Sequence, residues 1–215
     1  MKLNLQLAFL IWSATVIGLA AAPIDQKTSQ GPFSLGQAIS SLDKSKLTKT
    51  GGKESETKDG KKIPTEYYKF DTTGSNLLYG DIPVSSVHLD VVEGSVVTIY
   101  LLLDSDLLFG PRDKYDKSLE KRRTLSQALI AKYGPPKEVS DKPSEQTAFI
   151  WQGDDVTFAF YFTCPGFLGR LNDDGACVAF MSKRVTEKAN NTYLEALKSK
   201  AEQENEDAQK LKDKL

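Results

Sequence analysis

The spacing of apolar residues divides most of the chain into two successive runs of predicted elements. Helical spacing predicts a short helix over residues 33–42 and a longer one over 117–133, which ends at Gly134 and two prolines. Strands are predicted where apolar and polar residues alternate or where aromatic and β-branched residues are concentrated: 67–72, 85–92, 95–103, 147–152, 155–164 and 177–183. The order is therefore helix, three strands, helix, three strands.

This order predicts an α+β fold, with a single domain over residues 33–184. Two α-β-β-β units form an antiparallel sheet with helices on one face. Residues 95–103 are apolar on both faces, so we expect that strand to lie inside the sheet. Residues 23–32 are interpreted as a flexible lead-in, and 48–62, which are glycine-rich and charged, as a mobile loop. Residues 185–215 form a charged helical tail, expected to be solvated because the apolar repeat of a coiled coil is absent.

Residues 1–22 have the pattern of a secretory signal peptide. Lys2 precedes an uncharged apolar run, and small residues suited to signal peptidase allow cleavage after Ala20 or Ala22. The run is too short to span a membrane, and no cysteine at its end would carry a lipid. We therefore expect a periplasmic or secreted protein with no stable membrane anchor after cleavage. An uncleaved N-terminal anchor is the alternative.

Composition narrows the possible chemistry. The formal net charge is -1, which argues against an electrostatic nucleic-acid binder, and the single histidine excludes any site that needs two. Two acidic groups in predicted loops offer oxygen ligands, but neither has the spacing of a calcium loop, so solvated turns are the favoured interpretation. These are Asp104, Asp106 and Asp113, and Asn172, Asp173 and Asp174. We predict neither a metal nor a cofactor.

Cys164 and Cys177 are the two cysteines of the chain, and an exported protein most simply joins such a pair. Cys164 ends one predicted strand and Cys177 begins the next. If these strands pair, the cysteines lie opposite each other within disulfide range, and a bridge closing a loop of this size contributes about 3 kcal/mol. The loop between them displays Phe167, Leu168 and Arg170, a composition typical of protein-binding anchors. The alternative is that its apolar residues cap the sheet edge.

Two places could support hydrolysis. The run from Phe70 to Ser75 resembles the Asp-Thr-Gly-Ser motif of aspartic proteases, with an extra threonine after Asp71. His88 shares the polar face of its predicted strand with Ser86 and Asp90, although triads are usually assembled from separate elements. A secreted hydrolase using Asp71, or His88 with Asp90, is one alternative. A small-ligand carrier using the aromatic strands of residues 149–162 is another, and core packing also explains those aromatic residues.

Short motifs resemble small exported envelope proteins. A helix ending in Lys132-Tyr133-Gly134-Pro135-Pro136 precedes a strand with Trp151, and Phe33-Ser34-Leu35-Gly36 begins the first predicted helix. Over residues 33–183 the chain resembles the SmpA/OmlA-type envelope domain and the β-lactamase-inhibitor-protein-like repeat. The resemblance implies an α+β fold and binding to another protein. The leading hypothesis is an exported, non-enzymatic, protein-binding or inhibitor-like envelope module, more plausibly a binder than an enzyme.

Overall fold

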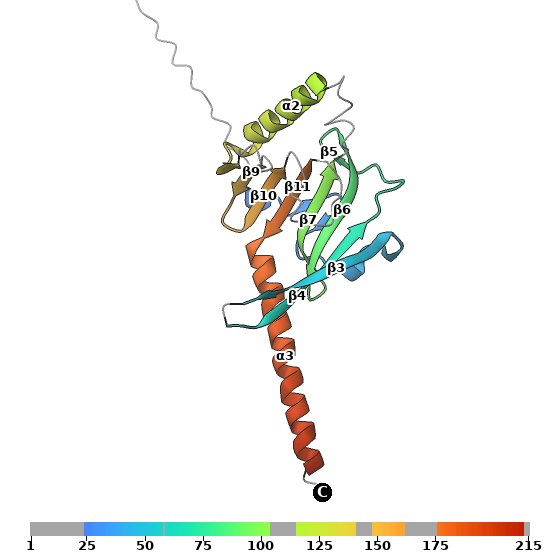
Figure 1. Ribbon diagram of the computed structural model, residues 1–215, viewed down its shortest axis with the longest axis vertical. Coiled ribbons are helices and arrows are strands. Elements are labelled where there is room, and N and C mark those ends of the chain that lie inside the picture. Colours follow the sequence, from blue (N-terminus) through green and yellow to red (C-terminus); the bar gives the residue numbers. More distant parts are fainter. Residues whose placement is uncertain (1–23, 58, 104–114, 141–147, 162–175, 213–215) are drawn as a thin grey trace, which may run out of the picture.

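One antiparallel sheet forms the body of the molecule (Figure 1). The computed structural model describes residues 24–57, 59–103, 115–140, 148–161 and 176–212. The eight strands run in the order β3-β4-β6-β7-β11-β10-β9-β8. Their bounds are Leu47–Glu56 (β3), Lys62–Phe70 (β4), Ile82–Val92 (β6), Ser95–Leu103 (β7), Glu138–Ser140 (β8), Ala148–Gln152 (β9), Val156–Tyr161 (β10) and Cys177–Ser182 (β11).

The sheet is built from two halves that follow each other along the chain. The first half runs from β3 to β7 and the second from β8 to β11, and the last strands of the two halves pair at the centre. Two helices follow the pattern predicted from the sequence: α2 (Tyr115–Tyr133) precedes the second half, and α3 (Lys183–Lys212) follows it. The predicted α+β class with an antiparallel sheet is confirmed.

One face of the sheet carries the main core. Val87, Leu89 and Val91 of β6 point into it and are at most 1% exposed, as their alternation predicts. Phe158 and Phe160 of β10 lie in the same cluster and are fully buried. Packing in this core therefore explains these aromatic residues, which the sequence analysis also considered as contacts for a small ligand.

The two long helices, α2 of the second predicted unit and α3 of the predicted tail, contact opposite faces of the sheet. Leu125, Leu129 and Tyr133 of α2 pack against the main core cluster. Ala189 of α3 instead joins a second cluster on the other face, together with Ile63, Val92 and Val97. α3 begins directly after β11, so its first turns lie beside the end of that strand.

The segment 48–62, predicted to be a loop, is mostly strand. Residues 47–56 form β3, which pairs with β4 around a bulge between Lys49 and Gly51. Gly52 passes close to the Thr65 carbonyl oxygen, where an added Cβ would lie 2.9 Å away. Backbone pairing and surface contacts such as the Lys49–Glu66 ion pair hold this edge strand. Nearly all its side chains are exposed, so the apolar pattern could not reveal it.

The predicted helix at 33–42 is replaced by irregular structure. Phe33–Ser34 forms the short strand β2, which pairs with β1 (Ser29–Gln30), and Ile39–Ser41 is a single turn of 3-10 helix, η2. Gly36 lies between them at a φ of 82°, a conformation that interrupts any helix.

Three smaller elements are also described: η1 (Ile24–Gln26), η3 (Lys44–Lys46) and β5 (Leu78–Tyr79), which pairs with β6. None of the described helices is long and apolar enough to cross a membrane.

Candidate functional site

The three hydrolase candidates on β6 do share one side of the strand. Ser86, His88 and Asp90 face away from the main core, and Ser86 and His88 are both buried. Ser86 Oγ lies 3.3 Å from His88 Nε2, within hydrogen-bond distance. A hydroxyl beside an imidazole is the pairing of a nucleophile with its base. With only 4% of Ser86 exposed, a substrate would have to reach a covered hydroxyl.

Asp90 has a hydrogen-bond partner on the neighbouring strand. The Tyr100 hydroxyl of β7 donates to Asp90 Oδ2 over 3.4 Å. Burial raises the pKa of Tyr100 far above its ordinary value, and the charge of Asp90 raises it further, so the phenol stays protonated and able to donate. The polar side of β6 thus holds a serine–histidine contact and an aspartate–tyrosine contact.

Asp71 lies in the turn after β4 and does not join this group. Its Oδ1 accepts hydrogen bonds from Thr73 N at 2.8 Å and from Thr73 Oγ1 at 2.6 Å, which hold the pKa of the carboxyl below its ordinary value. The next residue, Thr72, donates its hydroxyl to the Ser85 carbonyl oxygen. An exposed aspartate that closes its own turn is a structural arrangement, whereas aspartic proteases need two carboxylates that share a proton.

The predicted disulfide and binding loop lie mainly outside the described residues. Cys177 begins β11 and is fully buried, while Cys164 is not described. Phe167, Leu168 and Arg170 also fall outside, as do the acidic residues considered for calcium: Asp104, Asp106, Asp113, Asn172, Asp173 and Asp174. The bridge and the loop contact therefore stay predictions. Among the described residues, no group of three or more histidine, cysteine or acidic side chains is placed to hold a metal ion.

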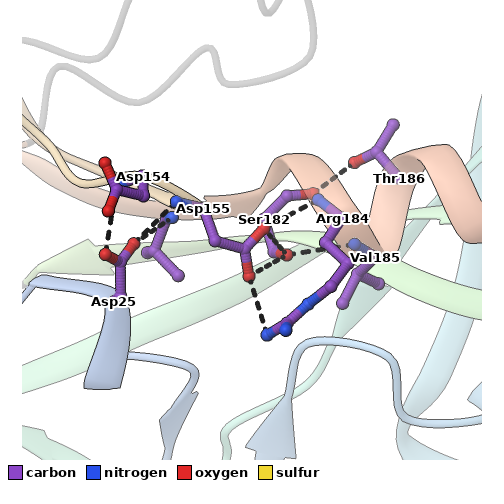
Figure 2. Close-up of polar contacts among 8 residues, drawn as sticks. Asp25, Asp154, Asp155, Ser182, Arg184, Val185 and Thr186 are labelled. Atoms are coloured by element: carbon purple, nitrogen blue, oxygen red, sulfur yellow. Dashed lines mark hydrogen bonds and ion pairs between the residues drawn. The ribbon is translucent and has the colours of Figure 1, made fainter.

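A polar network that sequence patterning did not reveal begins near the N-terminal end of the described chain (Figure 2). Asp25 of η1 accepts three backbone hydrogen bonds from the turn between β9 and β10: from Asp154 N at 3.0 Å, Asp155 N at 2.8 Å and Val156 N at 2.7 Å. These bonds lower the pKa of the Asp25 carboxyl. The segment expected to be a flexible lead-in is thus, from Ile24 onward, attached to the sheet.

Asp155 carries the network on to α3 (Figure 2). Its carboxylate accepts hydrogen bonds from the Ser182 hydroxyl at 2.9 Å, from Arg184 N at 2.7 Å and from Arg184 Nη2 at 3.2 Å. Ser182 Oγ in turn accepts from Val185 N at 3.1 Å. Two side chains therefore satisfy backbone N–H groups in the first turn of α3, which fixes where the helix starts.

Replacing Asp155 tests how strongly this cap holds the helix. The Asp155 side chain is only 18% exposed, and we expect Asp155→Asn to lower the free energy of unfolding by about 1–2 kcal/mol at neutral pH. The bond from Arg184 N, with those from Ser182, keeps the pKa of Asp155 below the ordinary 3.8. The stabilisation is therefore complete above that value and is lost as the pH falls through the depressed pKa.

Urea unfolding at several pH values measures this difference. The difference in the free energy of unfolding between the wild type and Asp155→Asn should disappear at acid pH. Asp154→Asn is the matched control, because it removes the same charge from the same turn while only its backbone contributes to the network. An equal loss in both variants would show that charge, not capping, is responsible.

The far part of α3 leaves the sheet. Figure 1 shows the helix running away from the sheet for most of its length. Tyr193 and Leu194 are the last residues that pack against the second cluster, and from Glu195 onward every side chain described is exposed. We call residues 195–212 the arm; at the rise of an α-helix it spans about 27 Å. The described residues from 195 onward are exposed, as expected of the tail, whereas residues 185–194 of the predicted tail pack against the sheet.

No family model, curated protein or solved structure matches this chain. The functional argument therefore depends on the contacts of its own residues.

Proposed function

We propose that this chain is an exported, non-enzymatic protein-binding module that uses the arm of α3 to contact its partner. The observation that carries the proposal is a helix firmly capped at its start and exposed along its second half. Helices of this length without tertiary packing are marginal in water, so a long exposed helix is either a spacer or a surface for another molecule.

The arm has an apolar row suited to such contact. Leu197, Ala201 and Ala208 follow one another at helical spacing on one side, and 43% of Leu197 is exposed. The row is narrow and flanked by charges, which favours a reversible contact with another amphipathic helix over a permanent coiled coil. Lys200–Glu204 and Glu206–Lys210 pairs, each at 3.9 Å, support the helix while it is unoccupied.

A cross-linking experiment tests the proposal on the mature full-length chain. A photo-reactive residue at position 201, in the apolar row, should give a discrete protein adduct when the chain is irradiated in its native envelope. The same residue at position 206, on the opposite side of the helix, should give much less. Adducts of equal yield at both positions, or at neither, would contradict arm-mediated binding.

A second candidate function is favoured by the Ser86–His88 contact of 3.3 Å. It supports a secreted serine hydrolase in which His88 would take the proton of Ser86. Covalent labelling by a fluorophosphonate that disappears in Ser86→Ala would favour this function over binding. The loop with Phe167, Leu168 and Arg170 remains a further proposed contact for a partner, to be probed in the same cross-linking experiment.

A further inference from the structure

Positive and negative charges are separated around the arm. At the α-helical repeat, Lys198 and Lys200 stand on opposite flanks of the apolar row, beside Leu197 and Ala201. Three carboxylates fall on the far side of the helix instead: those of Glu195, Glu202 and Glu206. All these side chains are exposed. The arm therefore presents a narrow apolar row between positive charges.

The two flanks carry a net positive charge. Lys200 Nζ lies 3.9 Å from Glu204 Oε1, but both side chains are mostly exposed, and such surface pairs contribute little. Lys198 has no carboxylate within ion-pair distance among the residues that the structure describes. The acidic residue on a flank, Asp207, is paired with Lys210 at 3.5 Å. The flanking lysines thus remain available to an acidic partner.

Neither solubility nor the helix dipole accounts for where these lysines lie. A helix that only has to stay in solution can carry its charges on every side. Basic residues in the last turn favour the helix dipole, which explains Lys212. Lys198 and Lys200 lie in the middle of α3, where the dipole has no such effect. Their placement beside the row is therefore informative about what contacts it.

The composition of the row distinguishes between possible occupants. An anionic membrane would attract the lysines, but helices that lie in a membrane surface bury large apolar and aromatic side chains. The row instead consists of Leu197 and two alanines, with Glu204 on the same side. A second copy of the arm would bring two net positive flanks together. Small side chains allow another helix to approach closely, which favours a helix of opposite charge.

We propose that the arm binds an amphipathic helix whose own apolar row is flanked by carboxylates. Aspartate or glutamate side chains on that helix form ion pairs with Lys198 and Lys200, as flanking charges do between paired helices. Apolar contact at the row supplies attraction, and the charges determine which helix is accepted. This inference rests on the proposed function, because it names the chemistry of the partner that the same arm contacts.

Two synthetic peptides of equal length test the charge preference of the mature full-length protein. Both have leucine at the a and d positions of a heptad repeat, and one carries glutamate, the other lysine, at every e and g position. Like charges keep each peptide from pairing with itself at neutral pH. Fluorescence anisotropy of each labelled peptide, titrated with the protein, should give a dissociation constant at least about tenfold lower for the glutamate peptide. Added sodium chloride should reduce this preference.

Charge reversal on the flanks is the decisive variant. The double substitution Lys198→Glu and Lys200→Glu should reverse the preference, so that the lysine peptide binds more tightly. The control is Lys188→Glu with Lys210→Glu, which changes the net charge equally but on the far side of the same helix. It should keep the preference of the wild type. Circular dichroism checks that both variants retain the helix.

Equal affinity for the two peptides, binding of neither, or a wild-type preference for the lysine peptide would overturn the inference. Binding to vesicles of phosphatidylcholine and phosphatidylglycerol without binding to the glutamate peptide would also overturn it, because the arm would then recognise a membrane. The cross-link at position 201 tests the proposed function separately. A discrete protein adduct there, together with no charge preference, would reject the acidic helix and leave arm-mediated binding standing.

Discussion

Phe158→Ala is expected to lower the free energy of unfolding by about 3–5 kcal/mol. Phe158 is fully buried at the centre of an aromatic group, with ring centres 5.2 Å from Tyr133, 5.2 Å from Trp151 and 5.3 Å from Phe180. These neighbours belong to α2, β9 and β11, so they cannot all move inward to fill the cavity. The loss should therefore combine lost burial with a residual void.

Urea unfolding followed by Trp151 fluorescence and by circular dichroism measures this effect. The slope of the transition should stay unchanged while its midpoint falls. Leu197→Ala, which truncates an exposed side chain of the arm, should change stability by no more than about 0.5 kcal/mol. A loss below about 1 kcal/mol for Phe158→Ala would mean that the second half of the sheet is not packed as described.

Gly153→Ala is expected to have the next largest effect, a loss of about 2–3 kcal/mol. Gly153 lies in the turn between β9 and β10, and an added Cβ would overlap the Asp25 carboxylate and the Ile24 side chain. The extra methyl must therefore displace η1 and break the bonds from Asp25 to the turn. Its backbone conformation does not require glycine, so the cost arises from this overlap.

Gly74→Ala provides a matched control for this substitution. Gly74 has a φ of 74° and nothing within 4 Å of its added Cβ. Alanine at this position therefore destabilises the fold only through an unfavourable backbone conformation. In thermal unfolding, the melting temperature of Gly153→Ala should be lower than that of Gly74→Ala. Hydrogen exchange should also show faster exchange at residues 154–156 and in the first turn of α3 only in Gly153→Ala. The reverse order would exclude tight packing of η1 against the turn.

Side-chain periodicity predicted the strands that depend on burial. The alternating residues of β6 and the apolar run of β7 specify a hairpin inside the sheet, and the structure places that hairpin there. Side-chain periodicity could not predict β3. The backbone hydrogen bonds of an exposed edge strand do not require any alternation of apolar and polar side chains. The first predicted helix is absent for a similar reason. Gly36 has a positive φ that is incompatible with a helix, and the spacing of apolar residues carries no information about such a backbone angle.

The polar network at α3 lay beyond sequence reasoning for a different reason. Asp25 is hydrogen-bonded to a turn about 130 residues further along the sequence, and a local sequence pattern cannot predict a contact between such distant residues. One sign was available in the sequence: α3, which starts at Lys183, has no acidic residue in its first turn, whereas Asp154 and Asp155 stand together in an earlier turn. Only the pairing of β10 with β11 brings Asp155 beside Ser182 and Arg184. The hydrolase candidates were easier to find from the sequence than this network, since alternation along one strand already puts Ser86 and His88 on one side.

Residue-resolved hydrogen exchange along α3 of the isolated mature protein tests the central claim most directly, namely that this helix is docked at its start and free along its arm. Amides of residues 187–194, held by the cap and by packing of Ala189 and Tyr193, should be strongly protected. Amides of residues 199–212 should exchange much faster, with the change falling near Leu197. Uniform protection through Lys212 would contradict the account, because it would show that the arm is already packed and cannot serve as an open surface for a partner.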